Sequence, residues 1–176
     1  MQSRLIMLFV HLLFLLAAAV SPVGNNADAA FAKLVALEGQ WSGSYEWSGA
    51  RADRGSMSAT YSITGNGSAV VENLTVDGKP LMTTVYHLDG DALRMTHYCA
   101  ARNQPRLRAR TIDLSRGVVQ FDFVDATNLR SADAPHVHGF EIHFVNDDHV
   151  QLVFLFHTGE QRSRETVDLK RVQRSL

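Results

Sequence analysis

Histidine is the residue type whose number and spacing point most directly to chemistry in this chain. Eight histidines occur in 176 residues, and seven of them lie beyond residue 80. His136 and His138 are separated by one residue, so on a β-strand their rings project from one side, about 7 Å apart. Neutral imidazole is a common ligand of zinc and other transition metals. The pair therefore suits a metal that takes a third ligand from a neighbouring strand.

The segment around residue 97 supplies two more candidate ligands. His97 and Cys99 alternate with polar residues and share a face with Met95. Cys99 is the only cysteine, and it would bind a metal as the thiolate. The predicted metal ligands are therefore His97, His136, His138 and Cys99. The alternative is that these histidines are hydrogen-bonded core residues.

Other kinds of site have little support in the sequence. The chain contains no Gly-x-Ser-x-Gly, no His-Glu-x-x-His and no phosphate-binding glycine loop, so neither a hydrolase nor a nucleotide-binding enzyme is indicated. The formal net charge is −1. A local basic stretch lacks the interleaved aromatic residues that stack on bases, and it consists of Arg102, Arg106, Arg108 and Arg110. No nucleic-acid partner is expected.

The residues beyond 40 alternate between apolar and polar types and are interrupted about every ten residues by turn-forming residues. Turns such as Asp77-Gly78 and Asp89-Gly90 are typical of β-hairpins. This pattern predicts ten antiparallel strands. They cover residues 41–49, 55–64, 68–77, 80–89, 91–99, 106–113, 117–125, 137–145, 149–158 and 160–172.

Short connections between these strands leave no room for crossover helices, so we expect an all-β fold. Closure into a single up-and-down barrel removes the two exposed sheet edges. A short amphipathic helix over residues 29–38 should precede the barrel, because Phe31, Leu34 and Leu37 have helical spacing. The one long connection, 126–136, is polar and is expected at the barrel mouth.

The apolar face of each strand should line the barrel interior. Aromatic and flexible side chains around few polar groups are typical of a pocket for a small apolar molecule. On the eighth strand, His138 shares its predicted face with Phe140. The predicted ligand-binding residues are His97, His138, Met95, Tyr61, Phe121 and Phe140.

The N-terminal segment has the three parts of a secretory signal peptide. Arg4 precedes an apolar run over residues 5–20, and Ala27 and Ala29 stand at the −3 and −1 positions of a cleavage site. We therefore predict a signal peptide over 1–29 and a barrel domain over 30–176, in the periplasm or secreted. The mature chain should contain no membrane span. A retained membrane anchor is the alternative.

Gly39, Gln40 and Trp41 match the Gly-x-Trp motif at the start of the first lipocalin strand, and Arg171 stands near the end of the last strand. The chain thus resembles the calycin superfamily of lipocalins, fatty-acid-binding proteins and nitrobindin-like barrels, including secreted bacterial members. This resemblance implies that Arg171 lies over the Trp41 ring. It also implies an apolar ligand in the lumen or, as in nitrobindin-like members, haem held by a barrel histidine.

Two functions follow from these features. The first is an exported binding protein that holds a small apolar or amphipathic ligand in the barrel lumen. The alternative is a haem- or metal-binding barrel, with or without enzymatic activity, that uses lumen histidines. The sequence identifies no particular cofactor.

Overall fold

The structure, a computed structural model, describes residues 26–174. Helix α1 (Asn26–Val35) precedes ten strands, and a short 3-10 turn, η1 (Gly65–Gly67), joins the second and third of them. The strands are β1 (Gly39–Gly49), β2 (Asp53–Thr64), β3 (Ala69–Val76), β4 (Lys79–Asp89), β5 (Ala92–Tyr98), β6 (Gln104–Asp113), β7 (Val118–Thr127), β8 (His136–Asn146), β9 (His149–Thr158) and β10 (Gln161–Arg174).

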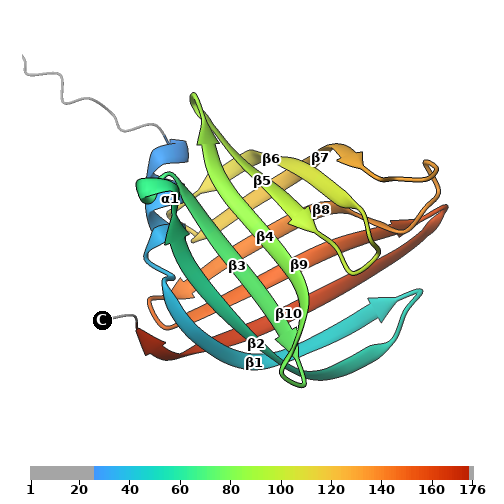
Figure 1. Cartoon of the computed structure of the whole chain (residues 1–176), viewed down its shortest axis with the longest axis horizontal. Helices are drawn as coiled ribbons and strands as arrows, with labels where there is room; N and C mark the ends of the chain where they lie inside the picture. Colours follow the sequence, from blue (N-terminus) through green and yellow to red (C-terminus); the bar gives the residue numbers. More distant parts are fainter. Residues whose placement is uncertain (1–25, 175–176) are drawn as a thin grey trace, which may run out of the picture.

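The strands form a closed antiparallel barrel in which sequence neighbours pair and β1 pairs with β10 (Figure 1). The predicted all-β up-and-down barrel of ten strands is confirmed, and each strand begins and ends within two residues of its predicted bounds. The turns use the predicted residues. Asp77 and Gly78, for example, have φ values of 51° and 72° in the β3–β4 hairpin, which is left-handed backbone that glycine adopts readily.

Helix α1 packs against β4, β5 and β6 at one end of the barrel (Figure 1). Its buried side chains are Ala27, Ala30, Phe31 and Leu34. The helix begins and ends three residues before its predicted bounds. Of the predicted signal segment 1–29, residues 1–25 lie outside the described part of the chain. Among the described residues, no helix has the length and apolar character needed to span a membrane.

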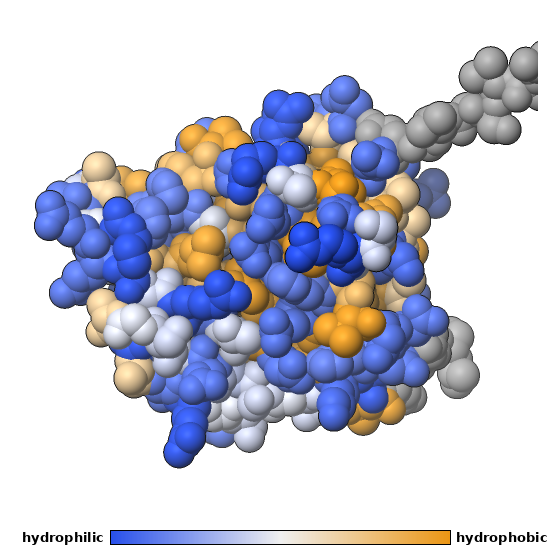
Figure 2. All heavy atoms as spheres, turned by 180° about the vertical axis from the view of Figure 1, so that it is seen from behind, coloured by the Kyte–Doolittle hydropathy of each residue, from blue (hydrophilic) through white to orange (hydrophobic). Residues whose placement is uncertain are grey.

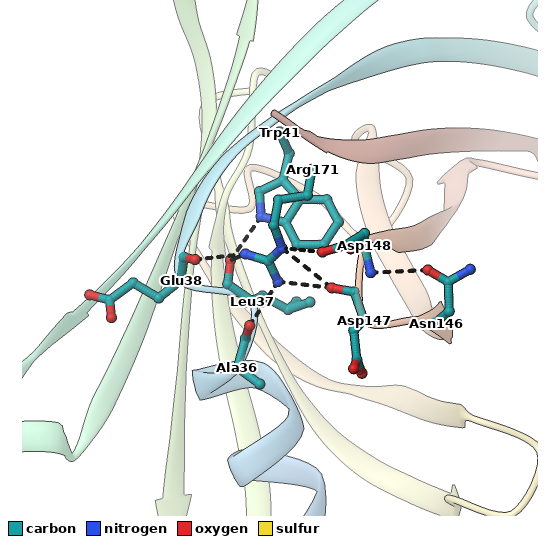
Figure 3. Close-up of polar contacts among 8 residues, drawn as sticks. All are labelled: Ala36, Leu37, Glu38, Trp41, Asn146, Asp147, Asp148 and Arg171. Atoms are coloured by element: carbon teal, nitrogen blue, oxygen red, sulfur yellow. Dashed lines mark hydrogen bonds and ion pairs between the residues drawn. The ribbon is translucent and has the colours of Figure 1, made fainter. Parts of the chain in front are cut away.

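Arg171 joins three parts of the chain at the α1 end of the barrel (Figure 3). Its guanidinium carbon lies 4.2 Å from the centre of the Trp41 ring, which confirms the predicted contact. The guanidinium donates to the carbonyl oxygens of Ala36, Glu38 and Asp147, and Trp41 Nε1 donates to the carbonyl oxygen of Leu37 at 2.8 Å. The bonds to Ala36, Leu37 and Glu38 satisfy carbonyl groups that the chain leaving α1 would otherwise leave unpaired, and the bond to Asp147 ties in the β8–β9 turn.

Apolar side chains are concentrated inside the barrel. The face seen in Figure 2 is mostly hydrophilic, with hydrophobic residues in separate small patches. Large side chains such as Tyr86, Phe121, Phe140 and Phe154 are at most 2% exposed and form one core with α1. A binding site enclosed by apolar side chains would therefore lie in the interior of the barrel.

Candidate functional site

A cavity of about 560 Å³ occupies one end of the barrel. Trp47 and Ala50 lie near the end of β1 that is farther from α1, so the cavity is at the opposite end of the barrel from the helix. Its lining residues come from strand ends and connecting loops: Tyr45, Trp47, Ala50, Arg51, Val76, Leu81, Met82, Ala100, Ala101, Pro135, Phe156, Thr158, Gln161, Ser163 and Glu165.

The cavity combines an aromatic wall with a buried acid. The Trp47 ring packs edge-on against Phe156 with the ring centres 5.1 Å apart, and the guanidinium of Arg51 lies 4.2 Å above Trp47. Glu165 is 2% exposed, and its Oε2 atom has no hydrogen-bond partner. Burial raises the pKa of Glu165 to about 7, although the positive charge of Arg51 opposes the shift. The carboxyl group can therefore donate or accept a hydrogen bond near neutral pH.

A second acid lies deeper in the barrel. The hydroxyl groups of Tyr61 and Tyr86 both donate to Glu72 Oε2, at 2.8 and 3.1 Å. Burial raises the pKa of Glu72 to about 7, and the hydrogen bonds from the two tyrosines oppose the shift. Because of burial and then the nearby carboxylate, the pKa values of Tyr61 and Tyr86 are well above 10.

His97 belongs to the same buried region. Its ring is fully buried and packs against Phe154 with the ring centres 5.1 Å apart. Its Nδ1 atom lies 2.9 Å from Thr84 Oγ1, and its Nε2 atom has no partner. Burial lowers the pKa of His97 to about 3, so the imidazole is neutral at physiological pH.

Five of the predicted ligand-binding residues do face the barrel interior. They are buried among other side chains of the barrel interior, and none of them lines the cavity described above. Each is at most 2% exposed: Tyr61, Met95, His97, Phe121 and Phe140. The prediction that these residues touch a bound molecule stays a prediction.

His138 lies elsewhere than predicted. The register between β8 and β9 shifts after Val137, so that Val137 opposes Phe156 while Gly139 opposes Leu155. His138 is the extra residue, and it is exposed. A β-bulge changes which way the following residues point. His138 therefore does not share a cavity with His97.

The predicted metal ligands are only partly brought together. His136 and His138 form a cluster with His157, in which one ring nitrogen of each residue lies within 4.8 Å of the other two. Among the described residues, neither His97 nor Cys99 belongs to such a cluster. Burial raises the pKa of the Cys99 thiol to about 11, which disfavours the thiolate. His157 on β9 takes the place predicted for these two residues.

The haem implied by the resemblance to nitrobindin-like barrels does not fit this interior. The cavity residues within the described part of the chain include no histidine. His97 presents the unpaired Nε2 atom that an axial ligand would need, but its ring is enclosed by core side chains.

Glu72, Glu165 and His157 were not singled out from the sequence. The sequence did contain a signal for the two acids. Glu72 is two residues from both Val70 and Leu74 and so lies on the same face of its strand as they do, and Glu165 lies on the same face as Val167. An acid on the apolar face of a strand is predicted to be buried in the barrel interior. His157 had no comparable signal, because its role depends on the pairing of β8 with β9.

Comparisons with known proteins support the fold. No protein-family model matches the chain, and no curated protein matches it in sequence. Among solved structures, Rv2717c from M. tuberculosis is similar with a TM-score of 0.59 and 14% identity, over 82% of this chain and 98% of that chain.

A protein of unknown function from the DUF3598 family of Nostoc punctiforme is similar with a TM-score of 0.53 and 14% identity, over 79% of this chain and 49% of that chain. The chain thus spans about half the length of this relative. At such identities, the two similarities show a shared barrel fold.

Proposed function

We propose that this chain is an exported binding protein of the calycin type that holds a small amphipathic molecule in the cavity at the barrel mouth. The observation that supports the proposal most is the cavity itself. Its volume of about 560 Å³ lies within the range of about 300–1,000 Å³ that is typical of small-molecule sites. Its walls are largely apolar, with few polar groups, as in most such sites.

An amphipathic ligand suits the lining better than a purely apolar one. Trp47, Met82 and Phe156 provide contact area for an apolar body. Glu165 places a buried carboxyl oxygen without a partner in the same wall. A buried polar atom without a hydrogen bond costs about 1–3 kcal/mol, so a ligand hydroxyl or amine that bonds to it gains affinity.

The mouth is held in shape by hydrogen bonds. Asn103 Nδ2 donates to the carbonyl oxygen of Pro135 at 2.8 Å, and the amide of Gly159 donates to the carbonyl oxygen of Asp133 at 3.0 Å. The 128–135 loop is thereby fixed to the β5–β6 loop and to the β9–β10 turn. A preformed site loses less conformational entropy on binding.

Binding can be tested with N-phenyl-1-naphthylamine, a fluorescent apolar probe with one N–H donor. Ser163 lines the cavity opposite Phe156, and Ser163→Trp should fill part of the volume. We expect this variant to bind the probe at least about tenfold more weakly. The new indole ring keeps the probe from burying part of its apolar surface, and a loss of about 1.4 kcal/mol in binding free energy lowers the affinity tenfold. Fluorescence titration measures the effect.

The matched control is Ser44→Trp, the same substitution at an exposed position of β1. It should bind the probe as the wild type does. Equal affinity in all three proteins, or no saturable binding by the wild type, would refute the cavity as the binding site. Native mass spectrometry of protein purified from its own host would then identify any retained molecule.

A further inference from the structure

A second site lies on the outside of the barrel. His136 and His138 on β8 and His157 on β9 form the three-histidine cluster, in which one ring nitrogen of each residue lies within 4.8 Å of the other two. Neighbouring residues of a strand point to opposite faces. Because Phe156 lines the cavity, the adjacent His157 points out of the barrel. His136 is the register partner of His157 and lies on the same side.

One ring of the cluster is oriented as metal-binding histidines usually are. His136 Nδ1 lies 2.8 Å from the carbonyl oxygen of Ala134, which can only accept, so Nδ1 carries the proton and Nε2 carries the lone pair. A hydrogen bond from the other ring nitrogen to a carbonyl oxygen fixes the tautomer and raises the basicity of a metal ligand. His138 Nδ1 lies 3.1 Å from the His136 Nε2 atom, so Nδ1–H donates a hydrogen bond to it. An ion bound between the two rings would take the place of that hydrogen, with the His138 proton moved to its Nε2.

The rings are held by aromatic packing. His138 stacks on His157 with the ring centres 3.9 Å apart and an interplanar angle of 15°. Phe123 packs against the other side of the cluster, with its ring centre 5.0 Å from His138 and 5.1 Å from His136. Because stacked rings have nearly parallel lone pairs, either the His138 or the His157 ring has to turn before both can face a single ion.

We propose that the three-histidine cluster binds one divalent transition-metal ion of the zinc and copper class. Three imidazoles are a donor set that these metals prefer over magnesium or calcium. With three protein ligands, a tetrahedral ion keeps one position for water or another small ligand. The site is distinct from the cavity, which has no histidine among its described lining residues.

Zinc chloride added to untagged, chelator-treated protein provides the test. Isothermal titration calorimetry should show one Zn²⁺ per chain, with magnesium chloride giving no binding. His138→Ala and His157→Ala should each weaken zinc binding more than about 100-fold, since loss of a residue that only hydrogen-bonds to a metal ligand already costs about 10–100-fold. With Cu²⁺, electron paramagnetic resonance should show hyperfine coupling to nitrogen that both substitutions reduce.

The matched control is His143→Ala, a half-exposed histidine on β8 that contacts Glu141. It should bind zinc as the wild type does. Circular dichroism and the N-phenyl-1-naphthylamine titration confirm that each variant folds, and His138 is exposed, so its removal leaves no cavity in the core. Absence of zinc binding by the wild type, or unchanged affinity in a His138→Ala/His157→Ala double variant, would overturn the proposal.

Discussion

At the scale of single residues, the barrel interior contains acids whose surroundings favour the protonated form. Glu72 accepts hydrogen bonds from Tyr61 and Tyr86 in a fully buried position, and its pKa is about 7 rather than 4.5. Between these two pH values the folded chain holds a proton that the unfolded chain has released. The raised pKa of Glu72 therefore stabilises the fold below pH 4.5. This contribution to the unfolding free energy is lost as the pH rises to about 7.

Glu72→Gln should remove this pH dependence, because the amide does not titrate and its oxygen can still accept from the tyrosines. The unfolding free energy of the variant should rise relative to the wild type by about 3 kcal/mol between pH 4.5 and 8, given 1.36 kcal/mol for each pKa unit. Urea denaturation at a series of pH values measures the difference. Glu46→Gln, at an exposed position of β1, is the control and should follow the wild type. Parallel curves for Glu72→Gln and the wild type would contradict the prediction.

At the scale of elements, α1 connects the predicted export signal with the barrel. Four of its residues, 26–29, fall within the predicted signal segment, while Phe31 and Leu34 supply its large buried side chains. Cleavage after Ala29 would remove the small buried side chain of Ala27 and keep both larger ones. The helix can therefore still cover the end of the barrel after processing.

We predict a mature N-terminus at Ala30, because Ala27 and Ala29 occupy the small-residue positions that signal peptidase requires. The intact mass of the protein recovered from the periplasm or the medium measures it. Ala29→Arg is the control, since a large charged residue at −1 should block cleavage and leave the precursor. Recovery of wild-type protein that still begins at Met1 would count against export by cleavage.

At the scale of the whole molecule, barrel closure depends on the seam between β1 and β10. Gly43 opposes Leu169 in this seam. A Cβ atom added at Gly43 would overlap the backbone carbonyl oxygen of Asp168, which cannot move without breaking the ladder. Only glycine permits the two strands to approach so closely.

Gly43→Ala should therefore lower the unfolding free energy by about 3 kcal/mol, at the upper end of the usual cost of overpacking. Gly139→Ala is the matched control, because there the added Cβ meets only the Leu155 side chain, at 3.1 Å. Thermal or urea unfolding should show a much smaller loss for the control. Equal stability of the two variants would show that the seam tolerates separation.

The sequence by itself was enough to predict the strands, the turns and the closed barrel. Alternation of apolar and polar residues is a local property. The preference of glycine and asparagine for the positive φ angles of hairpin turns is also local. The contact between Trp41 and Arg171 was also predictable, through the calycin resemblance, because it lies where the first and last strands must meet.

Only the tertiary structure decided the position of the sites. A one-residue bulge in β8 turned His138 away from His97 and towards His157, and alternation cannot reveal a bulge before the partner strand is known. The cavity is likewise the space left after core side chains such as Phe121 and Phe140 have packed. Both depend on contacts between residues distant in sequence, and local patterns do not encode these contacts.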